Sequence, residues 1–157
     1  YAAGDCTGVL ALASVAAMQG RIAMWHSLGD AVSPLDLTQV SANIFTAPEI
    51  ATVGVAESAI TSGQVRGAVT MLPLARNPRA KMLGISEGFV KLFSHRASGL
   101  VIGGVVVAPR AGELIYPITL AIANRLTVDQ VANAFTVYPS LSGTIAEAAR
   151  VLHDKRG

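Results

Sequence analysis

The sequence has little charge and almost no cysteine. Only 14% of its 157 residues are charged and 52% are hydrophobic, whereas about 25% charged residues are usual in a globular domain. The single cysteine, Cys6, excludes an internal disulfide and suits a reducing cytoplasm, and we expect it to pack as a small apolar residue. The net charge of +2 comes from scattered residues without a basic stripe, so we expect no nucleic-acid partner.

Long hydrophobic runs are also missing. A helix that spans a membrane needs about 20 consecutive apolar residues. The longest candidates are Val9–Met18, which Ser14 interrupts, and 114–123, which Pro117 and Thr119 interrupt. We therefore expect no membrane span, and expect the surplus apolar surface to be covered by another subunit or by a missing part of the same protein.

Motifs for nucleotides and metals are absent as well. Neither Gly-x-Gly-x-x-Gly nor a P-loop occurs, so this chain is not expected to bind a dinucleotide unaided. His26, His95 and His153 lie far apart, and we interpret them as surface residues rather than metal ligands. Ser140 and Ser142 lack the strand–turn–helix setting of a hydrolase nucleophile.

The N-terminal residues have the pattern of a strand that ends at a turn, Tyr1–Asp5, followed by a helix predicted from Thr7 to Leu28. A natural protein rarely begins at such a point, so we interpret the chain as partial. Apolar residues crowd most of the helix surface, which predicts a largely buried helix. Asp5 has two interpretations: a cap of this helix, or a carboxylate that accepts hydrogen bonds from ligand hydroxyl groups.

After a linker over 29–37 the hydrophobic pattern becomes strand-like, and helices return only near the end. Strands are predicted over 39–46, 50–55, 65–74, 88–95 and 100–108, helices over 56–63, 111–124, 128–135 and 142–153, and a loop over 76–83. Strands in a run followed by helices in a run favour an α+β domain, an antiparallel sheet with helices on one face. Thr127 and Ser142 are expected N-caps, and Gly103–Gly104 indicates a bulge or a close backbone approach.

In their order, these segments resemble the flavoprotein disulfide reductases, which include lipoamide dehydrogenase and mercuric reductase. Tyr1–Asp5 is similar to the second flavin-binding motif of that family, and the helix after it is similar to the helix that faces the flavin. Matches to the dimerisation domain occur at Phe45–Gly54, Gly88–Leu92 and Ala111–Ile115. The resemblance covers nearly the whole chain.

The resemblance implies the C-terminal part of a homodimeric, FAD-dependent NAD(P)H oxidoreductase that is inactive as this chain alone. It assigns residues 1–36 to the end of the FAD-binding domain with a linker, and residues 37–157 to the dimerisation domain. The expected partners are a second copy, the FAD- and NAD(P)-binding domains of the parent chain, and a small-molecule electron acceptor. The implied cofactor-binding residues are Gly4, Asp5, Ala11, Leu12, Ala13 and Pro139.

The segment 137–143 departs from the family pattern. Disulfide-reducing members read His-Pro-Thr-x-x-Glu here, and their histidine–glutamate pair moves a proton in the partner's active site. Tyr138 stands in place of that histidine and Gly143 in place of the glutamate. A phenol is a poor proton shuttle at neutral pH, so dithiol–disulfide exchange is not expected. This resembles the actinobacterial branch that is often labelled lipoamide dehydrogenase but reduces quinones.

Alternatives remain open for the segment and for the whole protein. Tyr138 either lines an acceptor site across the dimer interface, where its ring stacks on a planar acceptor, or only shapes a turn with Pro139. The parent protein is either an NAD(P)H:quinone (or other acceptor) reductase or a dihydrolipoamide dehydrogenase-type disulfide reductase with a substitute acid. A third alternative is a dimerisation fragment without a redox role.

Overall fold

The computed structural model describes residues 1–154, and the chain divides into two compact units, Tyr1–Val40 and Ser41–Gly157. The first unit contains the 3₁₀ helix η1 (Asp5–Thr7), helix α1 (Ala13–Ser27) and the 3₁₀ helix η2 (Leu37–Gln39). Helix α1 begins later than predicted because Gly4 and Gly8 both adopt positive φ and fold the residues between them into η1.

The N-terminal unit leaves its apolar side chains uncovered. Val15 is the one buried residue of the fully described helix α1, whereas Met24 and Leu28, its C-cap, are 60% and 75% exposed. The predicted burial of this helix is therefore wrong for the unit by itself, which offers no second layer to pack against. Cys6 is also exposed instead of packing as a small apolar residue.

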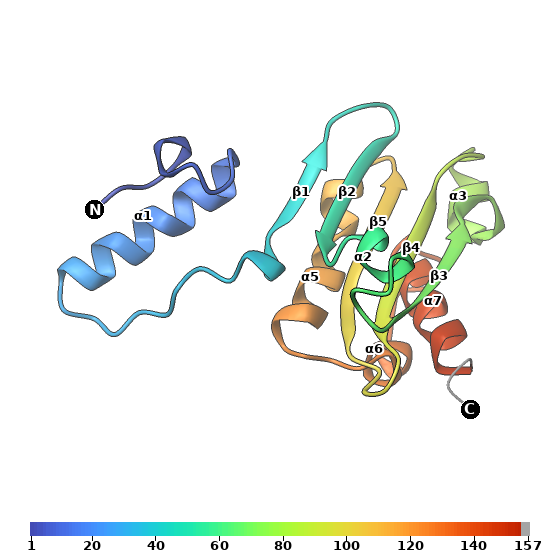
Figure 1. The fold of residues 1–157 in the computed structure, drawn as a ribbon. Coiled ribbons are helices and arrows are strands. Elements are labelled where there is room, and N and C mark those ends of the chain that lie inside the picture. The colour runs from blue at the N-terminus through green and yellow to red at the C-terminus, as the bar shows by residue number, and fades with distance from the viewer. Residues whose placement is uncertain (155–157) are drawn as a thin grey trace. The chain divides into compact units, whose positions relative to one another are not determined.

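The second unit is a five-stranded antiparallel sheet with the strand order β1-β2-β5-β4-β3 (Figure 1). Its strands are β1 (Ser41–Ile44), β2 (Glu49–Gly54), β3 (Gly67–Pro73), β4 (Phe89–His95) and β5 (Val101–Ala108). Its helices are α2 (Glu57–Thr61), η3 (Leu74–Arg76), α3 (Pro78–Met82), α4 (Ala111–Leu114), α5 (Tyr116–Ala123), α6 (Val128–Asn133) and α7 (Gly143–Asp154). The predicted α+β class is confirmed.

The main core lies between the sheet and the helices α4, α5 and α7 (Figure 1). Leu92 of β4, Val106 of β5 and Leu152 of α7 are at most 1% exposed there, and each such side chain stabilises the fold by roughly 1.5–3 kcal/mol. Neighbouring residues of a strand face opposite sides, so Lys91 faces away from this core, where it pairs with Glu57 of α2. Helix α2 therefore lies on the other face, which the prediction of helices on one face did not include.

Two predicted segments differ in the structure. The loop predicted over 76–83 contains α3, because Asn77 caps that helix and Pro78 occupies its first turn. The helix predicted over 111–124 is divided into α4 and α5, with Pro117 in the first turn of α5. The Thr127 cap is confirmed, and the strands predicted over 88–95 and 100–108 pair as the antiparallel strands β4 and β5. No described helix is long and apolar enough to cross a membrane.

Gly103 and Gly104 of β5 make the close backbone approach that the sequence indicated, and a bulge lies next to Gly103. The register between β4 and β5 shifts at Phe93/Ser94. A Cβ on Gly103 would lie 2.8 Å from the Val55 oxygen, and one on Gly104 would lie 2.9 Å from Ile118 Cδ1. Both distances are too short for a side chain, so these glycines let α5 and the chain after β2 approach the sheet.

We expect Gly104→Ala to lower the free energy of unfolding by about 1–3 kcal/mol, because the new methyl group overpacks the contact with Ile118. Gly143→Ala is the control, since its Cβ would meet Ser140 Oγ at an ordinary 3.4 Å. Urea unfolding at one fixed protein concentration measures both variants. Equal stability of Gly104→Ala and the parent protein would contradict the close approach.

Candidate functional site

The turn at Gly4 is held to helix α1 by Gln19. The Gly4 N–H donates to Gln19 Oε1 at 2.8 Å, and Gln19 Nε2 donates to Thr7 Oγ1 at 3.1 Å. The Thr7 hydroxyl in turn donates to the Gly4 oxygen at 2.8 Å. Sequence reasoning missed this role of Gln19, because a polar residue within a helix carries no signal of its partner.

Asp5 follows this turn and is exposed. Helix α1 begins only at Ala13, its N-cap is Leu12, and η1 has no side-chain cap, so the interpretation of Asp5 as a cap is wrong. Within residues 1–154 the Asp5 carboxylate has no hydrogen-bond or ion-pair partner. It is therefore a charged acceptor that the described chain leaves available.

The N-terminus of α1 offers donors in the same unit. Leu12 is extended and provides no side-chain cap, and the first intrahelical bond runs from Ala16 N–H to the Leu12 oxygen. The N–H groups of residues 13–15 therefore have no partner within the helix. Ala13 and Ser14 are small and exposed, so an electron-rich ligand atom can reach these N–H groups at the positive end of the helix dipole. The N–H of Leu12 itself is bonded to the Leu10 oxygen.

The second group of candidate residues lies between α6 and α7. Phe135, Val137 and Tyr138 are 106%, 78% and 82% exposed, and the Tyr138–Pro139 peptide bond is cis. At the start of α7, Ser140 Oγ accepts the Gly143 N–H at 3.1 Å. The hydroxyl that caps α7 is thus that of Ser140, and not that of Ser142 as predicted.

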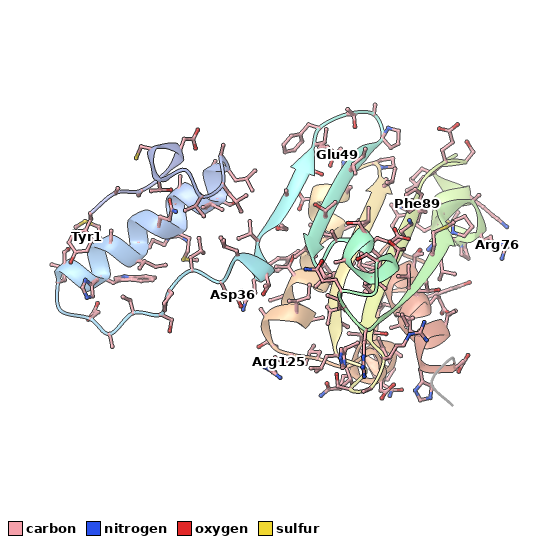
Figure 2. The ribbon with its side chains drawn as sticks, viewed as in Figure 1. Tyr1, Asp36, Glu49, Arg76, Phe89 and Arg125 are labelled. Atoms are coloured by element: carbon pink, nitrogen blue, oxygen red, sulfur yellow. The ribbon has the colours of Figure 1, made fainter. Side chains whose placement is uncertain are left out.

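A cavity of about 240 Å³ opens beside Tyr138. One wall is formed by the end of β3 and the residues after it, and the other by residues 136–140 with the first turns of α7. Glu147 lines this cavity and is ion-paired with Arg150. Arg76 stands at its edge, exposed and extending away from the sheet (Figure 2), without an ion-pair partner among the described residues.

The histidines each bond a local partner. His26 is 2.8 Å from the Tyr1 hydroxyl, and His95 Nδ1 is 3.1 Å from Ser98 Oγ. His153 Nδ1 pairs with Asp129 at 2.7 Å. The described residues bring no three His, Cys, Asp or Glu side chains together in a metal-binding group.

The pKa of Asp36, which lies outside these candidate sites, is shifted. The Thr38 hydroxyl donates to Asp36 Oδ1 at 2.6 Å, and the Thr38 N–H donates to the same oxygen at 2.9 Å. These hydrogen bonds, the hydroxyl first, hold the pKa of Asp36 below its ordinary value. Asp36 caps η2, so it acts as a structural residue at the end of the first unit.

The sequence model of the pyridine nucleotide-disulphide oxidoreductase dimerisation domain matches residues 40–149. The chain belongs to this family. A domain of this kind implies a homodimer, and the family consists of FAD-dependent flavoprotein oxidoreductases. The family assignment predicted from the motifs is therefore confirmed.

Similar proteins are known over nearly the whole chain. It is 62% identical to an NAD(P)H dehydrogenase (quinone) of Mycobacterium tuberculosis over 98% of this chain and 32% of that protein. It is 35% identical to a dihydrolipoyl dehydrogenase of Chlamydia trachomatis over 98% of this chain and 33% of that protein. The crystal structure of LpdA from Mycobacterium tuberculosis matches with a TM-score of 0.94 and 62% identity, over 97% of this chain and 33% of that one. The chain thus spans about a third of these relatives.

Proposed function

We propose that the chain is the C-terminal part of a cytoplasmic, FAD-dependent NAD(P)H oxidoreductase that passes electrons to a quinone or a similar small acceptor. The observation that carries this proposal is the absence of an acid–base pair at the segment 138–143. Within residues 1–154, the Tyr138 hydroxyl has no hydrogen-bond partner, and Gly143 has no side chain to orient it. The 62% identity to a quinone dehydrogenase supports the same proposal.

The chemistry of a quinone acceptor suits such a site. Reduction of a quinone to a hydroquinone consumes two electrons and two protons, and water supplies the protons where the site is open. Dithiol–disulfide exchange instead needs a base that takes the proton of a thiol. Glu147, the carboxylate that lines the cavity beside Tyr138, is held by Arg150 and is a poor substitute.

The residues of the first unit fit FAD. Asp5 has a free carboxylate that accepts hydrogen bonds from the hydroxyl groups of a ribityl chain. The free N–H groups at the start of α1, with exposed Ala11 and Ala13 beside them, suit the electron-rich edge of a flavin ring. The turn at Gly4 positions Asp5, and Gly4 itself has no side chain that would occupy space beside the carboxylate. FAD supplies the hydride-accepting ring, and these residues bind and orient it.

Tyr138 and Pro139 belong, in this proposal, to the acceptor site of the partner subunit. An exposed aromatic ring next to a cavity offers a flat apolar surface on which a planar acceptor stacks, and the ring excludes water from one side of that acceptor. The NAD(P)H and the greater part of FAD are bound by the domains of the parent chain that precede this segment.

A disulfide reductase is the second candidate, because the chain is also 35% identical to a dihydrolipoyl dehydrogenase. It requires an upstream cysteine pair and an acid in place of the missing histidine. A dimerisation fragment without a redox role is disfavoured, since the free Asp5 carboxylate and the uncapped α1 have no use in a scaffold.

In the full-length protein, Asp5→Ala should weaken FAD binding about tenfold or more, because a hydrogen bond to a charged group contributes about 1.5–3 kcal/mol. Fluorescence titration of the apoprotein with FAD measures this affinity. Cys6→Ala is the control, since the neighbouring thiol is exposed and donates to the Ala3 oxygen, and its loss should not change the affinity. Full FAD affinity in Asp5→Ala would exclude the assigned role.

The acceptor assignment predicts that the full-length protein oxidises NAD(P)H with a benzoquinone and not with lipoamide. Tyr138→Ala should raise the KM for the quinone about fivefold, because an aromatic contact contributes about 1 kcal/mol. Tyr138→Phe keeps the ring and should leave the KM unchanged. Rapid lipoamide turnover by the unaltered protein would instead identify a disulfide reductase.

A further inference from the structure

Asn77 joins two segments that lie far apart in the sequence. Its Oδ1 accepts the N–H groups of Arg79 at 2.8 Å and Ala80 at 3.2 Å, which caps α3. Its Nδ2 donates to the Ser140 oxygen at 2.9 Å and to Thr144 Oγ1 at 2.7 Å. One side chain therefore makes four hydrogen bonds, two to its own helix and two across the cavity.

The bond to the Ser140 oxygen joins Asn77 to the segment that carries Tyr138, and the bond to Thr144 joins it to α7. Among the described residues, no other hydrogen bond joins residues 135–142 to the β3–α3 side of the fold. Leu141 packs against the core as a partly buried side chain. Residues 135–138, in contrast, point into solvent with three large exposed side chains. The position of Tyr138 thus depends on how firmly Ser140 is held.

Asn77 also links the two walls of the cavity. Asn77 lies on one wall, and Ser140 and Thr144 lie on the other. A hydrogen bond of 2.7–2.9 Å between the walls fixes their separation at this point. Loss of the bond to Ser140 would remove the one hydrogen bond among the described residues that holds residues 136–140 to this wall.

We propose that Asn77 is a positioning residue of the acceptor site, which holds the Tyr138–Pro139 turn in the position from which Tyr138 reaches the acceptor in the partner's site. The proposal rests on the proposed function, in which the acceptor stacks on Tyr138. Asn77 acts through Ser140 and Thr144 and does not itself touch the reacting atoms.

The alternative is that Asn77 only caps α3. Asn77→Ser separates the two roles, because serine caps a helix about as well as asparagine but its short side chain does not reach Ser140 or Thr144. Thr144→Val removes one of the two acceptors with little change in volume. If both variants act through one contact, the double variant should show less than the product of the two single effects.

The test uses the full-length flavoprotein and p-benzoquinone. Asn77→Ser should raise the KM for the quinone about threefold, less than the fivefold expected for Tyr138→Ala, because Asn77 acts only through the position of that ring. Thr144→Val leaves the bond to Ser140 in place and should raise the KM about twofold. The rate at which NAD(P)H reduces the bound flavin, measured by rapid mixing, should stay unchanged in both variants. Gly104→Ala serves as a control that is destabilised elsewhere and should keep the KM of the unaltered protein.

The proposal is overturned if Asn77→Ser leaves the KM unchanged, whether or not it lowers the unfolding midpoint, since the bonds to Ser140 and Thr144 would then serve stability alone. It is also overturned if Gly104→Ala raises the KM equally, which would make the effect one of general stability. Failure of the unaltered protein to reduce quinones while it reduces lipoamide would refute the proposed function instead. In that case the KM for lipoamide is measured in Asn77→Ser. A raised KM supports the positioning role, and an unchanged KM excludes it.

Discussion

Burial of one face of the sheet is the interaction on which the rest of the second unit depends. Strand β5 lies in the middle of this sheet, and its glycines let α5 pack close to the backbone. Helix α7 packs on β3 and β4 through side chains such as Ile145 and Leu152. Because this packing fixes α7, its N-terminal turn lies beside α3. The segment that carries Tyr138 precedes this turn and lies at the edge of the core.

The same hydrophobic effect explains what the chain leaves exposed. With 52% hydrophobic residues and 14% charged ones, it cannot cover its apolar surface by itself. Trp25 in the first unit and Phe135 in the second are 46% and 106% exposed. The chain contains a dimerisation domain and spans about a third of its relatives, so we propose that a second copy and the rest of the parent protein cover these surfaces.

Local patterns predicted the second unit well and the first unit poorly. The strand patterns of β4 and β5 and the Thr127 cap act over a few residues, so the sequence is sufficient to find them. The start of α1 was misplaced because two positive-φ glycines override helix propensity. The bonds of Gln19 and Asn77 join distant segments, and a single sequence has no signal for such pairs. Asn77 followed by Pro78 is a typical start of a helix, and sequence reasoning missed it at α3.

We propose that each redox site combines the Asp5 unit of one subunit with Tyr138 of its partner. Hybrid dimers of Asp5→Ala and Tyr138→Ala subunits test it most directly. One site of each hybrid then has both the bound flavin and an intact Tyr138, so quinone reduction should return with the KM of the unaltered protein, at about half its activity. If the hybrids keep the raised KM of Tyr138→Ala, the site lies within one subunit and Tyr138 does not act across the dimer interface.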